Sequence, residues 1–335
     1  MNKQRGFSIL EIFIGLALGS VLVAGVLSVF VGMRTTTEET SSIGELQENA
    51  RFALNVLTDD LLRQGFWGDL PGGLSTSTLQ AFPNGPAGTE CRGAGTNNGT
   101  FPAAAAGPFR ALWGATVAGN STMSCASVND AKRGSDLIQI KRAVTFPQPQ
   151  NQDGSLVNAL DSDRYYLYAN TSDGAVFRGN EATPPDVENG RYWQYQHHVY
   201  YVRDEVQGGQ TIPVLMQGRL TTGMTFGPLV EGIERIRFMY GVDSDGDGAV
   251  NAFISADNMT PQYWDNQGNI RILAVKIYVL ARSIFPDADY ENTQTYQMGD
   301  LNVSFVNGNG TGDNYRRLLL SSTVTLFNAR VDTWQ

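Results

Sequence analysis

The feature that most constrains this chain is an uncharged apolar run near its start, from Ile12 to Val31. A helix of that length, at about 1.5 Å per residue, spans roughly 30 Å, which is the thickness of a bilayer's hydrocarbon core. The run is long enough to cross and no small-residue cleavage site follows it, so it is typical of a retained membrane anchor. Lys3 and Arg5 before it predict that this end stays in the cytoplasm and that the chain after Arg34 is exported.

One acidic residue, Glu11, stands at the start of the apolar run. An ionised side chain in a membrane-spanning helix costs ~3 kcal/mol to insert and is a functional-site hypothesis by default. A carboxylate near the helix end can also reach the membrane interface and be tolerated there. We favour a functional Glu11, because a carboxylate in lipid needs a cationic partner.

The segment around this acid, RGFSILE, resembles the prepilin signature of type IV pilins and pseudopilins. The resemblance implies that residues 1–6 are a leader and that a prepilin peptidase cleaves between Gly6 and Phe7 and methylates the new amine of Phe7. It also implies that residues 7–33 form a transmembrane and filament-core helix, in which Glu11 pairs with the first amine of a neighbouring subunit. Many major pilins carry a proline within this helix; here none occurs before Pro71, which points to a minor subunit.

Residues 34–65 are predicted to continue the helix in amphipathic form. Apolar residues recur there at spacings of three and four, which indicates one buried stripe. The stripe consists of Ile43, Leu46, Ala50, Ala53, Leu57 and Leu61. Gly65 is the expected stop. Two helices with a break near Thr35–Thr37 are the alternative.

The exported part, residues 66–335, is large enough for a globular core of its own. The chain carries a net charge of −9, which excludes the basic footprint of a nonspecific nucleic-acid binder. Residues 71–134 are rich in Gly, Ala, Ser, Thr, Asn and Pro, which predicts a variable region of long surface loops. Its two cysteines, Cys91 and Cys125, are expected to form a disulfide in an oxidising compartment, with two free thiols as the alternative.

Alternating apolar residues predict strands at 135–146 and 197–205, and again in the C-terminal third of the chain. A long helix followed by such strands predicts an α+β fold with the helix packed on an antiparallel sheet. The only histidines, His197 and His198, are adjacent and so point to opposite faces of their strand. They cannot both bind one metal without a bend, and we expect them at the surface.

An acidic loop, DSDGDGAVN at 243–251, lies between two of the C-terminal strands. Alternating carboxylates followed by Gly248 are typical of a calcium loop, because hard cations prefer converging oxygen ligands. The candidate ligands are Asp243, Asp245, Asp247, the carbonyl of Ala249, Asn251 and, from further along, Asp257. The loop is not an EF-hand, since Ile254 stands where a bidentate Glu would be and the flanks are strands. A solvated acidic hairpin, in which the glycines only serve the turn, is the alternative.

Two parts of the chain resemble minor pilins of the PilW type. The first is QENARFALNVLTDDLLRQGFWGD at 47–69, and the second is residues 229–257 with the strands at 273–282 and 316–330. The resemblance implies a type IV pilin-like fold and a subunit that helps prime pilus assembly and sits at the pilus tip or base. It also implies residence in the inner membrane, then in the surface pilus. The implied partners are other minor pilins, the major pilin, the prepilin peptidase, the inner-membrane assembly platform and a tip adhesin.

Two other classes of function compete with this one. A large pseudopilin of a type II secretion system would share the helix, the size and the calcium loop. A membrane-anchored periplasmic hydrolase is disfavoured, because the sequence has no P-loop, no G-x-S-x-G, no H-E-x-x-H and no Cys–His pair in a plausible context. We therefore expect a protein that is not an enzyme.

Overall fold

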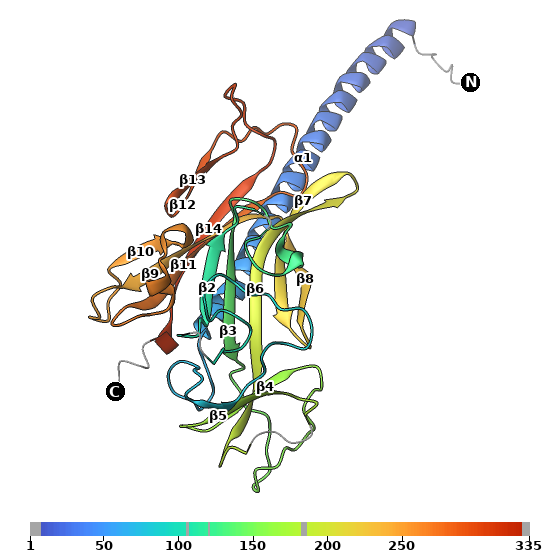
Figure 1. The fold of residues 1–335 in the computed structure, drawn as a ribbon. Coiled ribbons are helices and arrows are strands. Elements are labelled where there is room, and N and C mark those ends of the chain that lie inside the picture. Colours follow the sequence, from blue (N-terminus) through green and yellow to red (C-terminus); the bar gives the residue numbers. More distant parts are fainter. Residues whose placement is uncertain (1–7, 105–106, 120, 182–185, 330–335) are drawn as a thin grey trace. The chain divides into compact units, whose positions relative to one another are not determined.

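The computed structural model describes residues 8–104, 107–119, 121–181 and 186–329 (Figure 1). The chain divides into two compact units, Met1–Glu45 and Leu46–Gln335. The first unit is helical and the second holds all of the described strands. The expected α+β class is confirmed.

The N-terminal helix α1 (Ile9–Leu62) is 54 residues long and runs without a break through residues 35–37, so the two-helix alternative is wrong. Gly65 follows its end with a φ of +66°, a conformation that glycine adopts without a steric penalty. The chain then turns through Trp67, whose ring stacks on Tyr195 at a centroid distance of 5.7 Å. This turn brings the chain from the helix onto the sheet.

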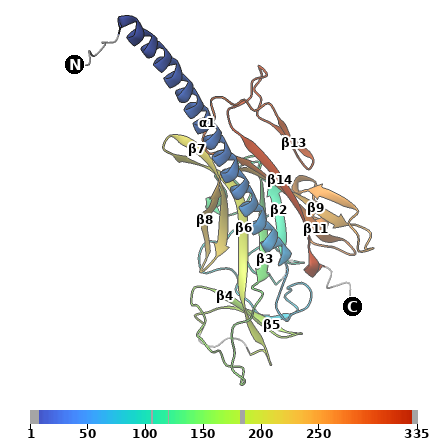
Figure 2. The ribbon, with the colours of Figure 1, turned by 180° about the vertical axis from the view of Figure 1, so that it is seen from behind.

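The first sheet of the second unit has eight strands in the described part of the chain. They are β1 (Leu79–Ala81), β2 (Leu112–Thr116), β3 (Asp136–Ala143), β4 (Tyr165–Ala169), β5 (Gly174–Arg178), β6 (Arg191–Gln207), β7 (Gln210–Leu220) and β8 (Met224–Glu231). The order is β1-β5-β4-β6-β3-β2, with β7 pairing β6 and β8 pairing β7. All of these pairs are antiparallel except β1 with β5. The long strand β6 organises the sheet, because it pairs with β4, β3 and β7 along its length (Figure 2).

A second sheet has the order β10-β9-β11-β14, and β12 pairs with β13 in a separate hairpin. The bounds are β9 (Ile233–Asp243), β10 (Ala252–Ser255), β11 (Arg271–Arg282), β12 (Thr295–Met298), β13 (Leu301–Ser304) and β14 (Arg317–Thr325). Three short helices, η1 (Ala126–Val128), η2 (Ala256–Asn258) and α2 (Pro261–Trp264), lie between strands. The strands predicted in the C-terminal third are confirmed, and their alternating residues, such as Ile236 and Val275, are fully buried.

The two sheets are joined through the start of β3. The carboxylate of Asp136 accepts a hydrogen bond of 2.8 Å from the backbone N–H of Phe238 in β9, and Ser135 Oγ accepts one of 3.0 Å from Ile236 N. Both Ser135 and Asp136 are fully buried. β9 is thereby fixed against β3, and the loop that follows β9 starts from a rigid strand.

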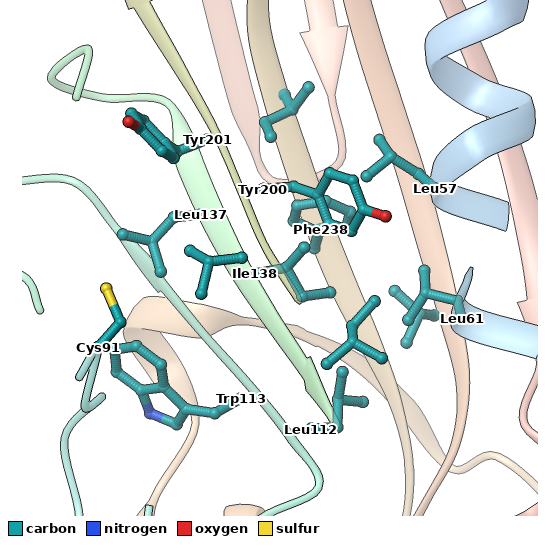
Figure 3. Close-up of a cluster of buried hydrophobic side chains, with 14 of the residues drawn as sticks. Leu57, Leu61, Cys91, Leu112, Trp113, Leu137, Ile138, Tyr200, Tyr201 and Phe238 are labelled. Atoms are coloured by element: carbon teal, nitrogen blue, oxygen red, sulfur yellow. The ribbon is translucent and has the colours of Figure 1, made fainter. Parts of the chain in front are cut away.

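The second part of α1 packs its apolar stripe on the sheet. Leu57 and Leu61 are fully buried and lie on the side of the core that also holds Tyr200 and Phe238 (Figure 3). The buried stripe begins at Leu46; Ile43 is 43% exposed, so its place in the predicted stripe is wrong. Each fully buried leucine contributes roughly 2 kcal/mol by removing its side chain from water.

Residues 71–134 are mostly irregular, as predicted, but only part of the segment lies at the surface. They contain β1, β2 and η1, and they bury Asn98, Thr100 and Phe101. The buried apolar residues, such as Leu74 and Met123, are scattered through irregular backbone, so the segment shows no apolar periodicity in sequence. The predicted disulfide between Cys91 and Cys125 is present, with a Cα–Cα distance of 4.7 Å.

Candidate functional site

The side chains of Ser8 and Glu11 cap the N-terminus of α1. Glu11 Oε2 accepts a hydrogen bond of 3.0 Å from Ser8 N, and Ser8 Oγ accepts one of 3.3 Å from Leu10 N. Together they form a capping box, which satisfies donors that the first helical turn leaves without intrahelical partners. The acid thus has a structural role in its own chain. The predicted processing residues, Gly6 and Phe7, lie outside the described residues, so cleavage, methylation and pairing with a neighbour's amine stay predictions.

Among the described residues, α1 is the helix long and apolar enough to cross a membrane. Its large apolar side chains between Ile9 and Met33 are each more than half exposed. The hydroxyl of Ser20 donates to Ala17 O at 2.8 Å, so it is satisfied within the helix, as a lipid environment requires. At Gly15 and Gly19 an added Cβ would meet no atom within 4 Å, so this face is open to close approach by another helix.

A buried ionic cluster holds the second part of α1 on the sheet. Asp60 in α1 is 3% exposed and accepts hydrogen bonds from Arg142 Nε at 2.6 Å and Tyr200 OH at 2.9 Å. His198 Nδ1 lies 2.7 Å from the second oxygen of the same carboxylate. Burial alone would raise the pKa of Asp60, but the His198 ring and the Arg142 guanidinium hold it well below its ordinary value. Asp60 is therefore an ionised carboxylate at neutral pH, bound to β3 and to β6.

The expected surface position of the two histidines is wrong. His197 is fully buried, with Nε2 2.7 Å from Gln139 Nε2 and Nδ1 3.3 Å from Thr100 Oγ1, while the side chain of His198 is 13% exposed beside Asp60. Burial lowers the pKa of His197 well below its ordinary value. The two rings do point to opposite faces of β6, as predicted, but α1 covers one face and the segment around Thr100 covers the other.

The acidic loop joins β9 to β10 as an antiparallel hairpin, with Ala252 opposite Val242. Carboxylate oxygens of Asp243, Asp245 and Asp247 all lie within 4.8 Å of one another. Gly246 and Gly248 both have a φ of +83°, which the tight turn requires. The glycines therefore serve the turn, and the turn brings the three carboxylates close together.

Hydrogen bonds within the loop fix its first aspartate. Asp243 is 2% exposed and accepts from Gly246 N at 2.7 Å and from Gly248 N at 2.8 Å. Burial by itself would raise the pKa of Asp243, but these two N–H groups lower it below its ordinary value. Asn251 lies across the loop, accepting from Ser244 N at 2.7 Å and donating to Asp245 Oδ2 at 3.1 Å.

Two of the predicted calcium ligands, Ala249 and Asp257, make hydrogen bonds with other residues. The backbone N–H of Ala249 donates to Asp247 Oδ1 at 2.8 Å, which holds this part of the loop closed. Asp257, in η2, does not join the convergent group in the described residues. Its carboxylate accepts instead from Thr116 Oγ1 at 2.8 Å and from Arg237 Nη1 at 3.2 Å. The side-chain oxygens of Asp243, Asp245, Asp247 and Asn251 are of the type that a hard cation prefers. Calcium binding there stays a prediction.

Comparison with known proteins gives one family. A family model described as type IV pilus-assembly protein W (PilW) matches residues 199–328. No curated protein and no solved structure matches the chain. The matched segment begins within β6 and includes β7 to β14 with the acidic loop, which is less than half of the chain. Over residues 199–328 the chain is thus similar to a type IV pilus-assembly family.

Proposed function

We propose that this protein is a minor pilin of a type IV pilus, without catalytic activity. One observation carries the proposal: a single helix joins an exposed apolar segment to a sheet domain whose residues 199–328 match PilW. The exposed half of α1 needs an apolar surrounding, which a membrane supplies before assembly and neighbouring pilin helices supply afterwards. The buried half connects that segment directly to the sheet.

In this proposal the prepilin peptidase cuts after Gly6 in the inner membrane, and the amine of Phe7 becomes the new start of the chain. Glu11 then exchanges its capping contact with Ser8 for a neighbour's amine, which sets the register between adjacent helices. The open face around Gly15 and Gly19 lets those helices approach closely. The subunit joins other minor pilins and the major pilin at the tip or base of the pilus, through the inner-membrane assembly platform, and an adhesin at the tip is a further partner.

The first test reads the mature N-terminus. The full chain is expressed with and without a prepilin peptidase, and the product is analysed by mass spectrometry beside a Gly6→Ala variant. We expect methylated Phe7 as the first residue only with the peptidase, and no processing of the variant. An intact Met1, or a cut beyond residue 30, would overturn the proposal.

A second test separates the two roles of Glu11. Glu11→Gln removes the charge but keeps an oxygen that can accept from Ser8 N, whereas Ser8→Ala removes the Ser8 hydroxyl from the capping box and keeps the charge. We expect both variants to be processed, and only Glu11→Gln to fail to enter pili in a co-purification assay. Equal incorporation of the two variants would contradict a charge pair with a neighbour.

Deletion of the gene in its host distinguishes a pilus from a secretion filament. Loss of surface pili with intact protein secretion is the result that the match to PilW favours. Loss of secretion with intact pili would replace the minor pilin by a large pseudopilin.

A further inference from the structure

A lysine is buried in the layer between β3 and residues 90–110. Lys141 is 0% exposed, and its Nζ donates to Asn98 Oδ1 and to Arg110 O, both at 2.8 Å. The ring of Phe109 lies 4.5 Å from the same nitrogen. Within the described residues no carboxylate lies within ion-pair distance of it. A buried ammonium without an anion is strongly unfavourable, and two acceptors match the two protons of a neutral amine.

The charge state of the amine follows from this environment. Burial lowers the pKa of Lys141 well below its ordinary value, and the positive charge of Arg110 lowers it further, against the opposing effect of Glu90. An unprotonated lysine amine is a nucleophile, whereas the ammonium is not.

The amide that faces this amine is buried as well. Asn98 is 0% exposed, and its Nδ2 donates to Ala94 O at 3.0 Å, which turns the carbonyl oxygen toward Lys141. The carboxylate of Glu90 lies beside the same segment, since it accepts from Thr100 N at 2.8 Å. A Cβ added at Gly99 would stand 3.0 Å from Glu90 Oε1. A nucleophile and an electrophilic amide are thus held together in a site shielded from water, with the partly exposed carboxylate of Glu90 on the neighbouring segment.

We propose that Lys141 and Asn98 form an intramolecular isopeptide bond. The amine nitrogen of Lys141 attacks Cγ of Asn98, the Cγ–Nδ2 bond breaks, and Nδ2 leaves as ammonia. One proton of the amine stays on the new amide nitrogen, and the other is transferred to Nδ2 as it leaves as ammonia. The reaction needs no oxidant, metal or cofactor. Holding the reacting groups together in a dry site supplies the rate, as in other intramolecular reactions.

The bond would close a loop across a sequence separation of 43 residues. It would tie β3 to the segment that also carries Cys91, whose disulfide reaches Cys125. Gln139, on the same face of β3, already donates to Cys91 O at 3.3 Å. Two covalent links would then hold this layer on the sheet, one of them resistant to reducing agents. A subunit exposed to pulling forces on a surface filament would gain resistance to unfolding.

The test is mass spectrometry of the full chain purified in detergent. After reduction, we expect an intact mass one ammonia below the mass of the sequence, corrected for any N-terminal processing. After digestion with trypsin, we expect a branched peptide that joins Lys141 to Asn98 and no cleavage after Lys141. The branched peptide is read on the unaltered protein, so the result does not depend on a variant that folds.

A variant distinguishes the cross-link from another loss of ammonia. Asn98 precedes Gly99, and cyclisation of such an Asn–Gly pair also releases ammonia. Lys141→Met should restore the sequence mass if the amine is the nucleophile. An unaltered protein at the sequence mass with normal cleavage after Lys141 would overturn the proposal, and so would an ammonia loss that persists in Lys141→Met. Neither result depends on the filament role of the protein.

Discussion

Replacing Asp60 by asparagine should weaken the attachment of the second part of α1 to the sheet. The change keeps the size of the side chain and removes only its charge. Asp60 lies 2.6 Å from Arg142 Nε, and the side chains of both residues are less than 10% exposed. The variant leaves the guanidinium of Arg142 buried beside a neutral amide, and it also removes the anion next to His198.

The magnitude follows from the burial of the pair. Removing one partner of a buried ion pair costs about 3 to 5 kcal/mol, because the other charge remains in a low-dielectric site. Asparagine still offers one carbonyl oxygen to Arg142 or Tyr200, so we expect about 3 kcal/mol. Asp59→Asn is the matched control. Asp59 pairs with Arg63 at 2.6 Å, but its side chain is 58% exposed, and such surface pairs contribute about 0 to 1 kcal/mol.

The assay is urea unfolding of the full chain in mild detergent, followed by tryptophan fluorescence. The free energy of unfolding is obtained from the midpoint and slope of each transition. We expect Asp60→Asn to lower it by about 3 kcal/mol and Asp59→Asn to leave it within about 1 kcal/mol of the unaltered protein. Equal effects of the two variants would refute the view that this buried pair fixes the helix.

The pH dependence of the same experiment has a definite sign. The folded protein holds the pKa of Asp60 well below the value of about 3.9 expected in the unfolded chain. The stabilisation is therefore fully present above that value and is lost as the pH falls toward the folded-state pKa. The difference between Asp60→Asn and the unaltered protein should be large at pH 7 and should shrink below about pH 4. A difference that grows on acidification would contradict the assignment.

Three further changes test other parts of the structure. Leu57→Ala should lower the free energy of unfolding by about 2 to 5 kcal/mol, because Leu57 is fully buried. Phe52→Ala, at a side chain 46% exposed, should change it by about 0.5 kcal/mol or less, and equal effects would argue against the buried stripe. Replacing Cys91 and Cys125 together by serine should cost about 3 to 4 kcal/mol in the same urea assay, since the bridge closes a sequence separation of 34 residues; an unchanged midpoint would contradict this. Calcium chloride, but not magnesium chloride, should raise the thermal midpoint of the unaltered protein and leave that of Asp245→Asn unchanged, whereas the same midpoint for both with calcium would remove the predicted site.

The parts of the fold that the sequence predicts are those whose apolar residues recur with the period of the element. β9 and β11 alternate between apolar and other residues, and their apolar positions, including Phe238 and Ile277, are fully buried. The sequence also predicts the second part of the helix, because the spacing of the apolar residues from Leu46 to Leu61 follows the helical period. In these elements local pattern and tertiary packing agree, so the residues alone identify the element and at least one of its buried faces.

The parts that the sequence does not predict depend on contacts between distant segments. β4 and β5 pair Tyr166 with Phe177, and their burial reflects neighbours that no local pattern reveals. The composition of the segment around Asn98 and Thr100, rich in small and polar residues, predicts a surface loop, yet these two side chains are buried. Buried polar groups form hydrogen bonds with partners that are distant in sequence, such as Asn98 with Lys141. The local periodicity of apolar residues carries no information about such partners.

One signal in β3 does point to the two-sided burial. Lys141 and Arg142 are consecutive, so their side chains point to opposite faces of the strand. If one face of the strand packs on the core, one of these two charged side chains must be buried. The structure buries both: Arg142 reaches Asp60 in α1, and Lys141 reaches Asn98 on the opposite side. Two adjacent charges in a strand of otherwise buried residues therefore indicate a strand covered on both faces.

The charge pair between α1 and β3 also selects one position of the helix along the sheet. An apolar stripe alone tolerates a shift by one helical turn, because leucine and alanine recur at that spacing. Such a shift would place Val56 or Gln64 in the position of Asp60, four residues away along the helix. Arg142 would then be buried without an anion, which costs several kcal/mol. The ion pair thus excludes the neighbouring registers of this part of α1 on the sheet.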